Sequence, residues 1–176
     1  MSSNLSWDAT TFTLADAYNA FQLNPGNLNT FKSDISAFRD RGGKILTWHD
    51  MADELLTSKT SDLYYEHVRS TLNSSIADLD KFYRYFRASG VGHFAGGPGA
   101  CFMGQTGGFA ASDEPEDNLL MSIVRWVEEG DAPEFNRGTK YLDDTLGEQV
   151  LFRRRHCKYP KISLHTGSGN RTDEEE

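Results

Sequence analysis

The run KILTW at residues 44–48 is the feature that most narrows the choice of fold. It is short and rich in β-prone residues, and it shows no alternation of apolar and polar side chains. That pattern is typical of a strand covered on both faces in a parallel sheet. The preceding Gly42 and Gly43 would end a helix and release the strand. The run therefore favours an α/β fold.

Further helix and strand patterns surround this run. Apolar residues recur at helical spacing before Gly42, in residues 58–72 and in residues 115–129. An aromatic, β-prone run covers residues 81–90, and residues 148–155 (EQVLFRRR) give a weaker strand signal. The order predicts an α/β layer fold, with a mostly parallel sheet and flanking helices. The apolar positions of the three helices are Leu28, Phe31, Ile35 and Phe38; Tyr64, Val68 and Leu72; and Leu119, Leu120, Ile123, Trp126 and Val127.

Composition argues against two classes of partner. The formal net charge is −8 and the basic residues are dispersed, so no nucleic-acid groove is expected. The exception, Arg153 to Arg155, is interpreted as part of a solvated strand or edge. No apolar stretch is long enough to cross a bilayer, and the first residues lack the basic and apolar regions of a signal peptide. As written the chain looks cytosolic, whereas its three Asn-x-Ser/Thr sites would suit a secreted protein.

Cysteine and histidine usage gives no metal or cofactor site. Cys101 and Cys157 are too few for a disulfide framework and lack the spacing of a zinc site. They are either one bridge or two free thiols. His49 and His67 also lack ligand spacing, and the glycine-rich residues 90–108 lack the Gly-Lys-Ser/Thr ending of a phosphate loop. Close packing of a loop is the simpler role for those glycines.

Two loops carry the candidate catalytic residues. In α/β folds, functional side chains follow the carboxyl ends of strands. HDMADELL follows the first strand and carries Asp50 and Asp53, and GVGH follows the second and carries His93. An imidazole held by a carboxylate can take the proton of a serine hydroxyl and return it to a leaving alcohol. The plainer interpretation makes Asp53 a turn former or helix cap and His93 an ordinary loop residue.

Several motifs in order resemble the C-terminal portion of the tannase and feruloyl esterase family, over roughly residues 7–169. They are FRDRGGKILTWHDMADELL, DLYYEHV, FYRYFRASGVGHFAGGPGA, LLMSIVRWVEEGDAP, CKYP and GSG. The resemblance implies an α/β-hydrolase fold and the hydrolysis of carboxylic esters, typically small esters of plant phenolic acids such as ferulate or gallate, by secreted enzymes. It also implies that Asp53 is the catalytic acid and His93 the catalytic base.

The third catalytic group is missing from this pattern. The family nucleophile is a serine directly preceded by a cysteine, and this chain contains no Cys-Ser pair and no Gly-x-Ser-x-Gly. Ser89 and Ser168 lie near glycines, but neither lies in a strand-to-helix turn ahead of Asp53. The chain is therefore interpreted as a C-terminal fragment without nucleophile, oxyanion hole or lid, and is predicted to be inactive alone. The family's calcium site resembles a feature of the absent lid, so no metal is predicted.

Other positions also depart from the family pattern. Phe94 stands where the family usually has a cysteine bonded to the one before the serine. Asp50 stands where a glycine is usual, and a side chain there is expected to disturb the turn that presents Asp53. Cys157 resembles half of a C-terminal bridge, for which the residues after it supply no partner.

Residues 1–170 are predicted to form the C-terminal segment of an α/β-hydrolase domain, and residues 171–176 a disordered acidic tail. Two hypotheses remain. The chain is part of a secreted ester hydrolase whose nucleophile lies upstream, or it is a non-catalytic remnant or binding module derived from that fold. Because KILTW would lack its upstream neighbour, the chain alone is predicted to aggregate or to fold only partly.

Overall fold

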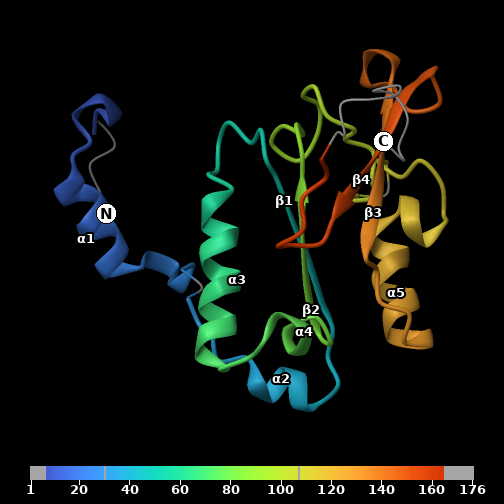
Figure 1. The fold of residues 1–176 in the computed structure, drawn as a ribbon. Coiled ribbons are helices and arrows are strands. Elements are labelled where there is room, and N and C mark those ends of the chain that lie inside the picture. The colour runs from blue at the N-terminus through green and yellow to red at the C-terminus, as the bar shows by residue number, and fades with distance from the viewer. Residues whose placement is uncertain (1–6, 30, 107, 165–176) are drawn as a thin grey trace. The chain divides into compact units, whose positions relative to one another are not determined.

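The computed structural model describes residues 7–29, 31–106 and 108–164. The chain divides into two units, residues 1–32 and residues 33–176 (Figure 1). Within the described ranges, no helix has the length and apolar character that crossing a membrane requires. The predicted acidic tail, residues 171–176, lies outside the described residues. The domain range 1–170 stays a prediction.

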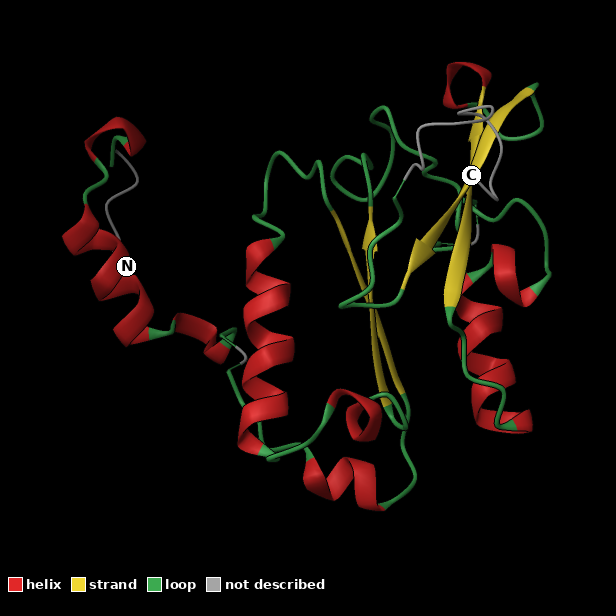
Figure 2. Cartoon of the chain, viewed as in Figure 1, coloured by secondary structure: helices red, strands yellow, loops and turns green. Residues whose placement is uncertain are grey.

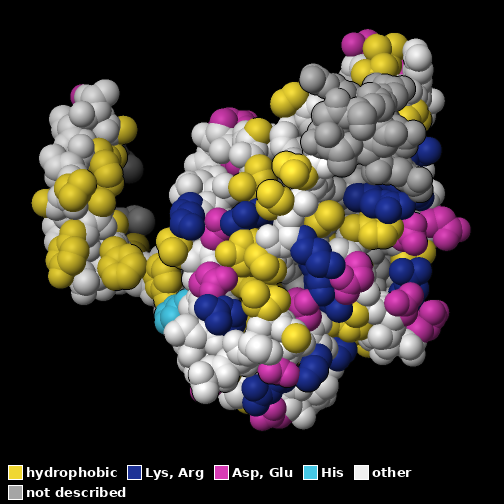
Figure 3. Space-filling model, viewed as in Figure 1, with side chains coloured by type: hydrophobic (Ala, Val, Ile, Leu, Met, Phe, Trp, Pro, Cys, Tyr) yellow, Lys and Arg dark blue, Asp and Glu magenta, His cyan; other side chains and the backbone are white. Residues whose placement is uncertain are grey.

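The N-terminal unit is built around helix α1 (Leu14–Leu23), between 3-10 turns at Ala9–Thr11 and Pro25–Asn27. Thr13 and Asp16 form a capping box: the Thr13 amide donates to the Asp16 carboxylate at 2.9 Å, and the Asp16 amide donates to the Thr13 hydroxyl at 3.3 Å. No residue of α1 is buried, and hydrophobic side chains lie at the surface of this unit (Figure 3). Helix α1 was not predicted from the sequence, although this capping pair is a signal for a helix start.

Strands β1 (Ile45–Asp50) and β2 (Tyr83–Ala88) form a two-stranded parallel sheet in the second unit (Figure 2). Both predicted strands are confirmed, and β1 continues two residues past KILTW. The register pairs Asp50 with Ala88, so both strands end at the same edge of the sheet. Loops that leave this edge therefore start side by side.

Helix α3 (Lys59–Thr71) connects β1 to β2 and confirms the helix predicted over residues 58–72. Tyr65 and Val68 of α3 are fully buried, and α4 (Ile76–Leu79) closes the same side of the sheet. Their common core lies between α3 and β2. It consists of Tyr65, Val68, Leu79, Phe82, Tyr83 and Tyr85.

The helix predicted through Leu28 and Phe31 is wrong in its first half. Helix α2 covers only Ser36–Asp40, because Ile35 has a non-helical backbone at φ −111° and ψ 23°. Leu28 is 82% exposed and Phe31 is 54% exposed, so their spacing does not reflect a buried helical face. The helix ends before Gly42, as predicted, and Gly42 has a left-handed backbone at φ +81°.

The predicted mostly parallel sheet is only partly observed. Strands β3 (Phe135–Tyr141) and β4 (Val150–Cys157) form a separate antiparallel pair, and β3 was not predicted. The short connection between them, which holds a 3-10 turn at Leu142–Asp144, allows antiparallel but not parallel pairing. The weak strand signal of EQVLFRRR corresponds to β4.

The helix predicted over residues 115–129 is divided at Asn118. A 3-10 turn covers Pro115–Asp117, and helix α5 covers Leu119–Glu129, with the Asn118 side chain accepting amide hydrogens at its start. Gly130, at φ +78°, ends α5 as predicted. The predicted apolar face is buried only at some positions: Leu119 and Trp126 are buried, whereas Leu120 and Val127 are exposed.

A second core supports the glycine-rich segment that follows β2. Its buried members are Ala88, Val91, Cys101, Phe102, Met103, Leu119 and Tyr141. The segment is attached to β3 by two backbone hydrogen bonds between Phe102 and Thr139, at 3.0 and 2.9 Å. The residues after β2 therefore have their own packed support.

Candidate active site

The first loop at the carboxyl edge of the sheet presents Asp53. Asp53 lies three residues after the end of β1, and its side chain is only 5% exposed. One carboxylate oxygen, Oδ1, accepts the amides of Leu55 and Leu56 at 2.8 and 2.9 Å. These two bonds fix the carboxylate and leave Oδ2 to point toward the neighbouring loop.

The second loop presents His93 after β2, and its glycines allow it to fold tightly on itself. A Cβ on Gly99 would lie 2.3 Å from the Ser89 carbonyl oxygen, which no side chain permits. The predicted role in close packing is confirmed for Gly90, Gly92, Gly97, Gly99 and Gly104, but not for Gly108, which has nothing within 4 Å of its Cβ position. The two loops are also joined, since the Ala52 amide donates to the Val91 carbonyl at 2.9 Å.

The structure brings Asp53 and His93 together. The distance between His93 Nδ1 and Asp53 Oδ2 is 2.9 Å, and the backbone amide of His93 donates to Glu54 Oε2 at 3.1 Å. A carboxylate is acceptor only, so it selects the tautomer with hydrogen on Nδ1 and the lone pair on Nε2. The His93 side chain is 38% exposed, and Nε2 makes no hydrogen bond within the described part of the chain.

The pair shifts the acidity of both members. Burial alone would raise the pKa of Asp53, but hydrogen bonds from Leu56, His93 and Leu55 outweigh it and lower the pKa to about 2. The hydrogen bond to Asp53 raises the pKa of His93 against the opposing effect of burial, and nearby carboxylates raise it further. Asp53 therefore remains a carboxylate near neutral pH and stabilises the imidazolium form of His93.

His49 is a neighbour that sequence reasoning considered only as an unsuitable metal ligand. Its Nε2 lies 3.5 Å from Asp53 Oδ2, and its Nδ1 lies 2.7 Å from the Ser61 hydroxyl on α3. The His49 and His93 rings therefore both lie near the same carboxylate oxygen of Asp53. No cluster of three or more His, Cys, Asp or Glu suited to a metal occurs in the described ranges.

The expected disturbance at Asp50 is not observed. Asp50 is the last residue of β1, and the left-handed backbone falls on Phe94, at φ +67°, rather than on Asp50. The Asp50 carboxylate instead accepts the Phe94 amide at 2.9 Å. A second side chain, Gln105, donates from Nε2 to the Phe94 carbonyl at 2.9 Å. Neither bond was anticipated, because no sequence signal marks a side chain that bonds a distant backbone.

No nucleophile lies beside His93 among the described residues. Ser89 follows β2 directly, downstream of Asp53, and Ser168 lies outside the described residues. Both cysteines are free thiols, with Cys101 buried. Burial raises the pKa of the Cys101 thiol, which disfavours the thiolate that attack would need.

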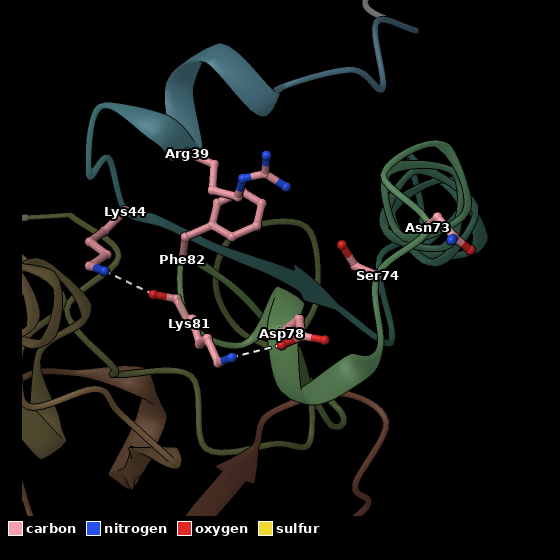
Figure 4. Close-up of a pocket in the computed structure, with 7 residues that line it drawn as sticks. All are labelled: Arg39, Lys44, Asn73, Ser74, Asp78, Lys81 and Phe82. Atoms are coloured by element: carbon pink, nitrogen blue, oxygen red, sulfur yellow. Dashed lines mark hydrogen bonds and ion pairs between the residues drawn. The ribbon is translucent and has the colours of Figure 1, made fainter.

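A pocket of about 440 Å³ lies at the opposite, amino end of the strands (Figure 4). Its cations are already paired: Lys44 donates to the Lys81 carbonyl at 2.8 Å, and Lys81 pairs with Asp78 at 2.7 Å. Arg39 pairs with Asp40 at 2.8 Å. Because this pocket holds no residue of the two loops, it is separate from the Asp53 and His93 pair.

Comparison with known proteins identifies relatives across almost the whole chain. Residues 3–176 match the family described as tannase and feruloyl esterase. Feruloyl esterase C of Talaromyces stipitatus is 47% identical over 172 residues, which are 98% of this chain and 32% of that protein. A probable feruloyl esterase B-2 of Aspergillus oryzae is 46% identical over 97% of this chain. The chain thus spans about a third of the length of the curated relatives it matches.

Solved structures agree with these sequence matches. The crystal structure of an esterase from Aspergillus oryzae has a TM-score of 0.92 at 46% identity and covers 98% of this chain and 34% of its own. Feruloyl esterase B from Aspergillus oryzae has a TM-score of 0.89 at 44% identity, also over 98% and 34%. The more distant tannin acyl hydrolase from Aspergillus niger has a TM-score of 0.62 at 22% identity, which shows a shared fold alone.

Proposed function

The chain belongs to the tannase and feruloyl esterase family, and from this premise we propose that it carries the acid–base half of a serine carboxylic ester hydrolase. Asp53 is the acid and His93 the general base. The observation that carries the proposal is the 2.9 Å contact between His93 Nδ1 and Asp53 Oδ2 at the shared carboxyl edge of β1 and β2. The proposed architecture of the whole protein is an α/β-hydrolase fold, of which the parallel pair is one part.

Asp53 and His93 would act through proton transfer. His93 Nε2 takes the proton of a serine hydroxyl as the serine oxygen attacks the ester carbonyl carbon. The resulting imidazolium, stabilised by Asp53, gives that proton to the leaving alcohol as the carbon–oxygen bond breaks. Water then attacks the acyl-serine with His93 again as base, releasing the acid and restoring the hydroxyl. These steps use no cofactor.

We propose that the nucleophile and the oxyanion hole come from a segment that these 176 residues do not include. The chain spans 32% of the length of Feruloyl esterase C and contains no Cys-Ser pair. The 176 residues alone would therefore not hydrolyse esters. For the whole protein we propose small esters of phenolic acids such as ferulate as substrates, the class that the names of its relatives indicate. Secretion is proposed from the family resemblance alone, and neither nucleic acid nor membrane is proposed as a partner, in keeping with the net charge of −8.

A chimera tests the proposal. This chain would replace the matching third of feruloyl esterase B from Aspergillus oryzae, which supplies the missing two-thirds. We expect the chimera to hydrolyse methyl ferulate and the 176 residues alone not to. Hydrolysis by the isolated chain that His93→Ala abolishes would contradict the assignment of the nucleophile to another segment. A folded chimera without activity would contradict the proposed function.

A non-catalytic role is the second candidate, since Nε2 of His93 meets no nucleophile within the described residues. In this alternative the Asp53 and His93 pair would stabilise the two loops and perform no chemistry. The chimera also separates the candidates. A purely structural pair would leave the folded chimera inactive, and replacing His93 would then change only its stability.

A further inference from the structure

We propose that Asp50 and Gln105 are positioning residues, which hold His93 against Asp53 by binding the two backbone groups of the next residue, Phe94. The inference rests on the proposed function, since it gives these residues a purpose in orienting the general base. Neither side chain contacts the imidazole itself. Both bind backbone groups of Phe94, the residue that follows His93.

Asp50 binds the amide side of Phe94. The Asp50 residue is 5% exposed, and its Oδ2 accepts the Phe94 amide at 2.9 Å. Its other oxygen, Oδ1, is buried without a hydrogen-bond partner among the described residues. A carboxyl group buried with so few donors is costly, and burial raises the pKa of Asp50. A role in fixing the Phe94 amide would explain why this costly buried carboxyl group is retained.

Gln105 binds the carbonyl side of Phe94. Its Nε2 donates to the Phe94 carbonyl at 2.9 Å and to the Cys101 carbonyl at 2.7 Å, and its Oε1 accepts the Met103 amide at 3.2 Å. The side-chain amide thus bonds through both its nitrogen and its oxygen. Because Cys101 and Met103 are fully buried in the second core, Gln105 ties the backbone of Phe94 to a rigid part of the molecule.

The backbone of Phe94 needs such support. Its φ of +67° is in the left-handed region, which a residue with a side chain adopts at a cost in free energy. The Phe94 ring packs on Phe109 at 5.5 Å between centroids, and Phe109 stacks on Phe102 at 5.1 Å. The two hydrogen bonds and the ring contact together fix a strained peptide directly after the base.

The consequence for His93 follows from chain geometry. The Phe94 amide belongs to the same planar peptide group as the His93 carbonyl, so fixing that plane limits rotation of the His93 backbone. On the other side, the His93 amide is held by Glu54 at 3.1 Å. Because the peptide groups on both sides of His93 are held, the imidazole keeps Nδ1 within hydrogen-bonding distance of Asp53. Nε2 then keeps one direction.

The test measures the pKa of His93 and the exchange of the Phe94 amide in the chimera with feruloyl esterase B, because the 176 residues alone are predicted to aggregate or to fold only partly. Hydrogen–deuterium exchange detected by mass spectrometry reads both, the first from the imidazole C2 hydrogen, and it works in dilute solution where aggregation is slow. We expect Gln105→Ala to lower the pKa of His93 and to speed exchange at Phe94 about tenfold, because the Phe94 backbone loses one of the two side-chain hydrogen bonds that hold it. This variant changes no charge, so a purely electrostatic effect cannot explain such a shift.

Asp50 is tested by two variants that lose the same charge. Asp50→Asn keeps an oxygen that can accept the Phe94 amide, whereas Asp50→Ala does not. We expect Phe94 exchange to be faster and the His93 pKa to be lower in Asp50→Ala than in Asp50→Asn. Phe94 exchange in Asp50→Asn should stay close to that of the unmodified chimera. Gln22→Ala and Asp113→Ala, which replace exposed residues of the same types, are the matched controls and should leave both values unchanged.

Unchanged Phe94 exchange and unchanged His93 pKa in a folded Gln105→Ala chimera would overturn the proposal. So would identical values for Asp50→Ala and Asp50→Asn. If Asp50→Ala does not fold, the Gln105→Ala result decides. No readout depends on ester hydrolysis, so an inactive chimera would count against the proposed function and leave this positioning measurable.

Discussion

The two ends of the β1–β2 pair differ in how their charged and titratable side chains are partnered. At the carboxyl end, Asp53 and His93 face each other across two joined loops, and Nε2 of His93 makes no bond within the described residues. At the amino end, the pocket's Lys81 is already neutralised by Asp78. The difference between the two ends is Nε2 of His93, an acceptor nitrogen without a hydrogen-bond partner among the described residues, whereas Lys81 is held in an ion pair. The proposed proton transfer depends on that nitrogen.

The largest expected effect is the loss of the base. In the chimera with feruloyl esterase B, His93→Ala should reduce kcat/KM for methyl ferulate by about 10⁴-fold or more, because an alanine side chain cannot take the serine proton. The matched change at the amino end, Lys81→Ala, should leave kcat/KM within about twofold. Equal losses of kcat/KM in His93→Ala and Lys81→Ala would contradict the proposed difference between the two ends.

The next effect concerns the acid. Asp53→Asn should reduce kcat in the chimera by about 10⁴-fold, since an amide can favour the wrong tautomer of His93 and cannot stabilise imidazolium. Asp78→Asn, at the other end, is the control and should retain activity. Steady-state kinetics on both variants sharpen the comparison. A kcat for Asp53→Asn within tenfold of the unmodified chimera would remove Asp53 from the proposed role.

A smaller effect is expected on stability from the glycine-rich loop. Gly99→Ala should destabilise the chimera by roughly 1–3 kcal/mol, because the added Cβ meets backbone atoms of Ser89 and Gly90. Gly108→Ala, where nothing lies within 4 Å, should change stability by less than about 0.5 kcal/mol. Thermal melting of the two variants measures the difference. Equal melting temperatures would show that the loop is not tightly packed.

The smallest effect is the pH dependence of stability. The raised pKa of His93 means that its contribution is complete below its unfolded value of about 6.5 and is lost as pH rises through the folded value. Asp53, with a lowered pKa, contributes above about pH 4 and loses its contribution as pH falls toward 2. The melting temperature difference between the unmodified chimera and His93→Gln should therefore be larger near pH 5 than near pH 9. A difference that grows toward pH 9 would have the wrong sign.

The same two ends show how far the sequence could predict the structure. KILTW and the aromatic run predicted two strands. Because parallel strands end at one edge of a sheet, the sequence also predicted that Asp53 and His93 lie together. Their mutual contact was predictable because it follows from topology. The role of the pair in catalysis remains a proposal.

Features that depend on distant backbone contacts were not predictable. Strand β3 was not predicted because FNRGTKY mixes polar residues with Gly138. A Cβ at Gly138 would lie 2.1 Å from the Ala100 carbonyl oxygen and 2.6 Å from His156 Nε2, contacts that only the folded structure reveals. The Asp50 and Gln105 bonds to Phe94 leave no spacing pattern at all. Helix α1 is different, since its Thr13 and Asp16 capping box was visible in the sequence.

The most direct test of the central claim, that His93 is the general base, compares two pKa values in the chimera. The pH profile of kcat/KM for methyl ferulate should rise as one group loses its proton. Exchange of the His93 C2 hydrogen measures the pKa of His93 independently. The account predicts that the two values agree and lie above the ordinary histidine value. A profile that is flat through the measured His93 pKa, or that rises more than about one pH unit away from it, would contradict the claim.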